Sequence, residues 1–262
     1  MYRASYGLEL SDVLPDNTAP ADFLKVRDKY FSFYPMVSVL KGPNIDYPNV
    51  QNKIDNYRDR IARVKYIVKV DGEPSEKYWL ALMRSWLSTL QVELDKAIAE
   101  KKIDVEKGVI VNGTSVSNGT LKEDQLLAYR LICSYGMTFN CSGRLGKVRL
   151  VDRSNTINVD GFYNYVKAWY NLDTMMYHVS QASFVPPPPK WSKDDKSDLI
   201  PPSQPFMYSQ IPFYLTGLTD TPTTVEMIKE IRAVCDEFAS KGLPNFPSGV
   251  AFTFWEQYMH LS

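Results

Sequence analysis

The sequence has few of the residues that most often carry catalysis or metal binding, with two histidines and three cysteines in 262 residues. Neither His178 nor His260 has a cysteine or carboxylate at ligand spacing, so each is expected to be an ordinary structural histidine. The chain also lacks a G-x-S-x-G elbow, a Walker loop, an H-E-x-x-H pair and a G-x-G-x-x-G turn. These absences predict that the chain is not an enzyme and has neither a metal nor a cofactor.

Net charge and long apolar runs are absent as well. Lys and Arg together number 30, Asp and Glu together number 30, and no basic stripe is interleaved with aromatics. This balance predicts that nucleic acid is not a partner. No run approaches the roughly 18 consecutive apolar residues of a membrane helix, so the chain is expected to be soluble as written.

Cysteines and sequons favour an extracellular setting. Asn112, Asn118 and Asn140 each begin an N-x-S/T sequon. Cys133 and Cys141 are close enough in sequence to close a short disulfide loop, and three unpaired thiols in a reducing compartment are the alternative. The N-terminal region has no basic start followed by an apolar stretch. Together these features predict a segment of a longer protein, with Met1 added for expression.

Hydrophobic periodicity predicts two strand-helix-strand units, one near each end of the chain. We expect helices at 20–33 and 50–64 and strands at 36–40 and 66–70, followed near the other end by a strand at 206–215, a helix opened by a capping box of Thr223 and Glu226 and stopped at Gly242, and a strand at 249–254. Further helices are expected after Ser75, with Trp79, Met83, Trp86, Leu90 and Leu94 on one side, at 121–133 and at 161–183. Cys235 lies in a helical stretch without an obvious mate.

This pattern predicts an α+β fold with a ferredoxin-like split β-α-β core and a large, mainly helical insertion. The predicted core covers residues 1–72 and 204–262, and the predicted insertion covers 73–203, within a single extracellular domain. Proline-rich segments after residue 185 are expected to follow an extended path back to the sheet.

Aromatic residues make up 13% of the sequence, and two interpretations stay open: core packing, or rings that line an apolar crevice for lipid. At the end of the chain, Phe254, Trp255 and Tyr258 suit a membrane interface, although an ordinary amphipathic helix explains them equally well.

Carboxylates leave two further functions open. A glycan-active enzyme could use two carboxylates from distant segments, although Asp194, Asp195 and Asp198 are expected in a solvated loop. The other alternative is a purely structural or adhesive extracellular domain.

Several motifs in order along the chain resemble the Patched family of Hedgehog receptors and sterol transporters, within the resistance-nodulation-division superfamily. The motifs are GLELSDVLP from Gly7, KYFSFYPM from Lys29, YPNVQ from Tyr47, WL from Trp79, RSWLSTLQ from Arg84, LAYRLI from Leu127, RLVD from Arg149, SQA from Ser180, SQIPFYLTGLTDT from Ser209 and GLPNFPSGVAFTFWEQY from Gly242. FWEQY and PFYL-GL-DT are the most specific of these. The resemblance covers nearly the whole chain.

The resemblance implies the second large extracellular domain, between the seventh and eighth membrane helices of a multi-pass parent at the extracellular face of the plasma membrane. The implied partners are the first extracellular domain and membrane helices of the same parent, a sterol or other lipid, a lipid-modified Hedgehog-related protein, and a second copy of the parent. The domain would help to enclose an apolar sterol conduit.

By motif position, the resemblance makes Leu8, Glu9 and Tyr34 candidates for lining the entrance for ligand and lipid, with Phe213 and Phe252 as further candidates. The sequence departs from the family pattern at the sequon-rich stretch 108–120, at the Cys133–Cys141 loop and at Val37, where the motif commonly has an aromatic. These departures suit a paralogue that uses other ligands.

Overall fold

The computed structural model describes residues 33–42, 45–111, 121–178, 183–195 and 197–256, together with the isolated positions 15, 18, 19 and 22. The expected helix at 20–33 therefore falls largely outside the described residues. So do Leu8, Glu9, Asn112, Asn118, Tyr258 and His260.

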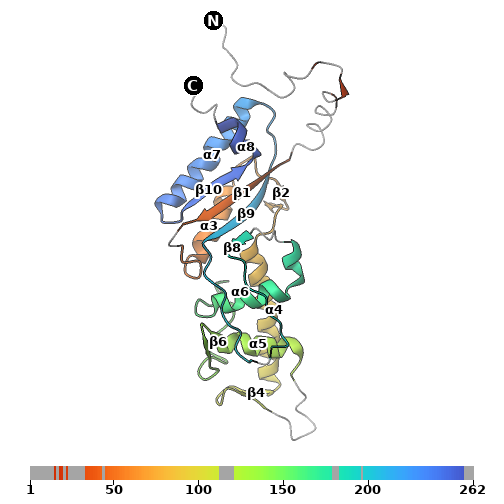
Figure 1. The fold of residues 1–262 in the computed structure, drawn as a ribbon, viewed down its shortest axis with the longest axis vertical. Helices are drawn as coiled ribbons and strands as arrows, with labels where there is room; N and C mark the ends of the chain where they lie inside the picture. Colours follow the sequence, from red (N-terminus) through yellow and green to blue (C-terminus); the bar gives the residue numbers. More distant parts are fainter. Residues whose placement is uncertain are drawn as a thin grey trace. The chain divides into compact units, whose positions relative to one another are not determined.

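The described chain is α+β and divides into two compact units (Figure 1). Of the described residues, those before 46, those at 53–77 and those from 208 onward belong to the first unit, and those at 46–52 and 78–207 belong to the second. The α+β class is confirmed, and six α-helices and several small antiparallel sheets are seen in the described residues. The ferredoxin-like core and the single-domain boundaries at 72, 73, 203 and 204 stay predictions.

The first unit is built on an antiparallel sheet in which β1 lies between β10 and β9 (Figure 1). Its elements are β1 (Tyr34–Lys41), α3 (Gln51–Ala62), β2 (Lys69–Val70), β3 (Glu73–Pro74), β9 (Tyr208–Leu215), α7 (Thr221–Ser240), β10 (Asn245–Gly249) and α8 (Val250–Trp255). In the register, Met36 lies opposite Phe213 and Ser38 opposite Ile211. These four residues therefore lie on one face of the sheet, and all four side chains are buried.

Helices α3 and α7 cover that buried face. The Tyr57 hydroxyl of α3 lies 2.9 Å from the Ser38 hydroxyl of β1, and the Tyr57 ring lies 5.2 Å from the Phe238 ring of α7. The apolar side chains of α7 recur at three- and four-residue steps, as an amphipathic helix requires: Met227, Ile228, Ile231, Val234 and Phe238 are buried. This layer is the core of the first unit.

The expected strand at 66–70 is reduced in the structure. Ile67 forms a single antiparallel bridge with Leu215, and only Lys69–Val70 continues, as β2, into a hairpin with β3. Asp71 and Gly72 both have positive φ, 53° and 84°, which is the backbone that a two-residue Asp-Gly hairpin turn needs. The turn therefore directs the chain away from β9 before a long strand can form.

The expected strand at 249–254 is wrong. The strand is β10, which ends at Gly249, and residues 250–255 form the helix α8. Pro247 is tolerated in β10 because this strand pairs only with β1 and lies at the sheet edge. Gly249 has φ 154°, and a Cβ there would lie 2.6 Å from the Pro35 carbonyl oxygen, so only glycine fits this close turn.

The start of α7 also differs from the prediction. Asp220 is the N-cap, and its Oδ1 accepts a hydrogen bond from the Thr223 backbone N–H at 2.7 Å. The helix therefore begins two residues before Thr223. Glu226 does not close a capping box, because its carboxylate accepts from the Tyr66 hydroxyl at 2.8 Å and from Lys65 at 3.1 Å. The predicted stop at Gly242 is confirmed, with φ 79° there.

The second unit is mainly helical. Its elements are α4 (Trp79–Ala99), β4 (Ile103–Asp104), β5 (Val109–Ile110), α5 (Glu123–Cys133), β6 (Ser134–Tyr135), β7 (Thr138–Phe139), α6 (Phe162–Leu172), the 3-10 helix η1 (Thr174–His178) and β8 (Phe184–Val185). The predicted helix at 121–133 is confirmed as α5. The helix predicted after Ser75 is confirmed as α4, which begins at Trp79 and continues to Ala99.

The predicted helix at 161–183 is too long. The structure ends α6 at Leu172, and Asp173 has extended backbone with ψ 118°. The Asp173 side chain accepts hydrogen bonds from Trp169 Nε1 at 2.8 Å and from the Met175 N–H at 3.0 Å. Asp173 thus lies at the end of α6 and at the start of η1. Short polar side chains can end a helix in this way, because their hydrogen bonds to nearby groups compete with those of the helix backbone.

Trp79 lies at the centre of the core of this unit. It is 1% exposed and makes edge-on contacts with the rings of four aromatic residues: Tyr47, Phe162, Phe184 and Phe206. Phe184 and Phe206 also stack with ring centroids 4.8 Å apart. Aromatic edge-to-face packing of this kind stabilises a core beyond the area that it buries.

Candidate functional site

The described candidates for the lipid entrance all belong to the first unit. Tyr34, at the start of β1, is half-buried, whereas Phe213 in β9 is 2% exposed and Phe252 in α8 is 4% exposed. Because Met36 lies opposite Phe213 and Tyr34 opposite Leu215, Tyr34 and Phe213 lie on the same face of neighbouring strands. Phe213 and Phe252 contribute to the core here, and the role of all three at an entrance stays a prediction.

The aromatic pair expected at a membrane interface lies at the end of α8. Phe254 is 60% exposed, and its ring lies 6.3 Å from that of Trp255, which is half-buried. The following Glu256 pairs with Arg232 of α7. None of the helices in the described part of the chain is both long enough and apolar enough to cross a membrane.

Cys133 and Cys141 form a disulfide across the β6–β7 hairpin. The Asn164 side chain holds the hairpin turn by accepting from the Gly136 N–H at 2.9 Å and donating to the Gly136 carbonyl at 2.8 Å. Asn140 follows the hairpin and is exposed. Its Oδ1 accepts from the Ser142 N–H at 2.9 Å. The third sequon is therefore accessible in a loop that the disulfide fixes.

The third cysteine, Cys235, is unpaired and buried. The Tyr57 hydroxyl lies 3.4 Å from its Sγ and donates to Asn245 Oδ1 at 2.9 Å. Burial raises the pKa of both the Cys235 thiol and the Tyr57 hydroxyl. A protonated thiol is a poor nucleophile. The contacts of the Tyr57 hydroxyl with Cys235 and Asn245 link α3 to α7 and β10.

Carboxylates do not converge into a site in the described residues. No group of three or more His, Cys, Asp or Glu side chains there could hold a metal ion. Asp194, Asp195 and Asp198 are exposed, as expected of a solvated loop. This loop is held through its backbone, because the Arg130 guanidinium donates to the carbonyls of 193, 197 and 198.

One pocket of the second unit lies beside that loop. Its volume is about 420 Å³. The lining combines apolar side chains, among them Trp86 and Leu126, with the acidic side chains of Glu123, Asp124 and Asp194. Lys193 pairs with Glu123 at the rim. The pocket is therefore lined by both apolar and acidic side chains.

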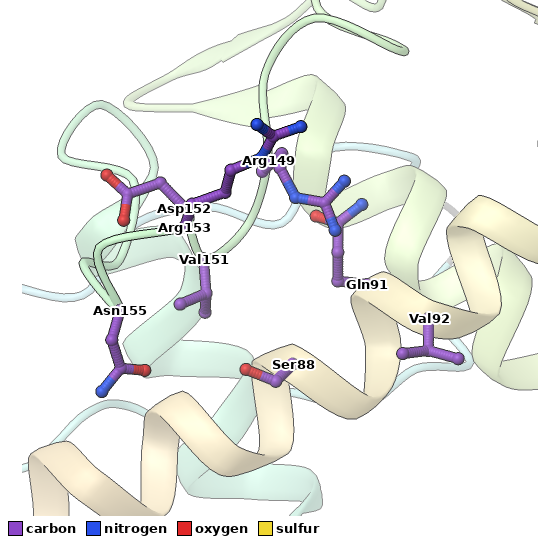
Figure 2. Close-up of a pocket in the computed structure, with 8 residues that line it drawn as sticks. All are labelled: Ser88, Gln91, Val92, Arg149, Val151, Asp152, Arg153 and Asn155. Atoms are coloured by element: carbon purple, nitrogen blue, oxygen red, sulfur yellow. The ribbon is translucent and has the colours of Figure 1, made fainter.

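A larger pocket, of about 530 Å³, lies between α4 and the loop 149–155 of the same unit (Figure 2). It is lined by Ser88, Gln91, Val92, Arg149, Val151, Asp152, Arg153 and Asn155. Sequence reasoning singled out the RLVD motif only for its family resemblance. The signal that could have located the pocket is the pair of arginines four residues apart, which meets α4 only after folding.

Comparison with known proteins gives consistent matches over the whole chain, although no family profile matches it. It is 57% identical to Protein patched homolog 1 of Caenorhabditis elegans over 100% of this chain and 18% of that protein. It is 48% identical to Protein patched homolog 3 of Caenorhabditis elegans, again over 100% of this chain and over 19% of that protein.

A match from another animal group agrees. The chain is 36% identical to Protein patched of Drosophila melanogaster over 99% of this chain and 20% of that protein. It therefore spans about a fifth of the length of these relatives. Because matches of 36% to 57% identity cover nearly every residue of the chain, the chain belongs to the Patched family.

Proposed function

We propose that the chain is the second large extracellular domain of a Patched-type membrane protein, between the seventh and eighth membrane helices. There it contributes to an apolar conduit for sterol or another lipid and to a surface that binds secreted, lipid-modified ligands related to Hedgehog proteins. The observation that carries this proposal is the 57% identity to a Patched homologue over the whole chain. Its role is binding and transport rather than catalysis.

Two structural features support the extracellular part of this proposal. The Cys133–Cys141 disulfide suits an oxidising compartment. The exposed Asn140 sequon suits the lumenal side of a secretory membrane. The partners of the domain would then be the first extracellular domain and the membrane helices of the same parent.

The lipid part follows from physical chemistry. Burying a sterol away from water is favourable by about 25 cal/mol for each Å² of apolar area. Where two domains form a passage together, each domain alone buries only part of that area. In the first unit, the rings of Phe213 and Phe252 are already used by the core. We therefore expect the chain to provide only part of a sterol site.

Titration of the 262-residue chain with a fluorescent sterol should accordingly show weak binding, and a tight stoichiometric complex would contradict the division of the site.

In the full parent, labelling by a photoreactive sterol should decrease in the Tyr34→Ala variant, because the half-buried ring of Tyr34 is the described candidate closest to solvent. The matched control is Tyr214→Ala, on the neighbouring strand, where the side chain is 39% exposed and points to the other face of the sheet. Equal labelling of the wild type and Tyr34→Ala would argue against Tyr34 as a lining residue.

Glycosylation tests the orientation independently of lipid. When the parent is made in animal cells, Asn140 is expected to carry an N-glycan, because its side chain is exposed and Ser142 completes its sequon. Removing glycans enzymatically should increase gel mobility, and Ser142→Ala should abolish the Asn140 contribution while Ser142→Thr retains it. A parent with no glycan at any of the three sequons would count against the extracellular location.

A further inference from the structure

The pocket between α4 and the loop 149–155 has a fixed frame. Gln91 is 4% exposed, and its side-chain carbonyl accepts from the Leu150 backbone N–H at 2.7 Å. Its amide donates to Asp95 Oδ1 at 2.8 Å, and Asp95 Oδ2 accepts from Arg149 at 3.0 Å. One buried amide thus joins the helix, the loop and a cationic side chain, which holds the pocket in one shape before any ligand arrives.

The two arginines of this pocket differ in their pairing. Arg149 is paired with Asp95, and each guanidinium carries five N–H donors, so donors remain. Arg153 is exposed, and no ion pair or hydrogen bond of its guanidinium is found among the residues that the structure describes. Figure 2 shows the two arginine side chains extending to one side of the loop. Two cations therefore face this space with Asp95 as the partner of only one.

Asp152 is an anion that also lines the pocket, but no ion pair between its carboxylate and Arg153 is found among the described residues, and its hydrogen bonds lie within its own turn. Its Oδ1 accepts from the Ser154 N–H at 2.8 Å, the Ser154 hydroxyl at 2.7 Å and the Thr156 N–H at 2.9 Å. These bonds hold the pKa of Asp152 below its ordinary value. In Figure 2 the Asp152 carboxylate points away from Gln91. The carboxylate therefore stabilises the turn at residues 152–156, and among the described residues it forms no ion pair with either arginine.

We propose that this pocket binds an oxyanion, such as a phosphate, sulfate or carboxylate group, carried on a small polar molecule such as an acidic sugar. Guanidinium groups recognise oxyanions through paired, charge-assisted hydrogen bonds. The Ser88 hydroxyl and the Asn155 amide, both at exposed positions in the lining, supply partners for sugar hydroxyls. A volume of about 530 Å³ exceeds that of a bare oxyanion and lies in the range of small-molecule sites.

Calorimetric titration of the whole chain tests this site with four probes: inorganic phosphate, glucose 6-phosphate, glucuronate and uncharged glucose. Saturable binding is expected for the acidic sugars and not for glucose. Arg153→Gln should weaken binding about tenfold, because it removes charge-assisted hydrogen bonds. Its melting temperature should be unchanged, since the side chain is exposed. The control Arg63→Gln removes an exposed arginine of the first unit and should bind as the wild type does.

The probes also identify the source of the oxyanion. Phosphate binding as tight as that of glucose 6-phosphate would indicate a site for the free ion, and tighter binding of the sugar phosphate would indicate a carried group. The proposal is overturned if none of the three anions binds saturably, if glucose binds as well as glucose 6-phosphate, or if Arg153→Gln binds with unchanged affinity.

Discussion

Trp79→Ala is expected to lower the free energy of unfolding of the second unit by about 3–5 kcal/mol, the usual cost of removing a large buried aromatic side chain. Trp79 is 1% exposed, and its ring contacts those of Tyr47, Phe162, Phe184 and Phe206. These neighbours come from segments far apart in the sequence. A cavity at Trp79 would therefore remove the contact that joins them, and the remaining rings could fill it only by leaving their own packed positions.

Two variants separate packing from general damage to the helix. Trp86→Ala removes the same side chain from the same helix, but Trp86 is only half-buried, so a clearly smaller loss is expected. Trp79→Phe should also cost less than Trp79→Ala. It retains a ring and removes an indole N–H for which no acceptor is found among the described residues. Urea unfolding followed by circular dichroism gives all three values, and equal losses for Trp79→Ala and Trp86→Ala would contradict the central role of Trp79.

Elements with a strong periodic pattern were predictable from the sequence, and those ended by a local hydrogen bond were not. The α5 prediction is confirmed because its apolar pattern stops at the cysteine that forms the disulfide. The helix after Gly161 was predicted too long because the pattern continues through Met175 and Met176. Only the structure shows the Asp173 carboxylate capping the next turn. Side-chain capping competes with periodicity and leaves little trace in hydropathy.

Candidate binding residues depend even more on tertiary contacts. The sequence located Phe213 and Phe252 as aromatic candidates but could not separate lining from core, and both are buried. The sequence did not predict the pocket beside Arg149 and Arg153, because this pocket depends on a contact between segments that are distant in the sequence. Its decisive residue, Gln91, lies 58 positions before Arg149, and it acquires its role only when the loop packs on α4. Neither the burial of the two phenylalanine rings nor the role of Gln91 can be deduced from residue spacing.

Removing the disulfide is expected to destabilise the second unit by about 2.5 kcal/mol, the loop-closure estimate for a loop of this size. The bond joins residues eight positions apart, so its main effect is to restrict the unfolded chain. In the folded state the hairpin has other support: the Asn140 N–H donates to the Cys133 carbonyl at 2.8 Å, and Asn164 holds the turn at Gly136. Replacing both Cys133 and Cys141 by serine should therefore leave the fold intact with a lower unfolding midpoint in urea.

Reduction gives the matched test in the unmodified chain. A reducing agent should lower the unfolding midpoint of the wild type to that of the double variant and should leave the double variant unchanged. The buried, unpaired Cys235 gives no disulfide to reduce. If reduction leaves the wild-type midpoint where it was, the bond does not stabilise the unit.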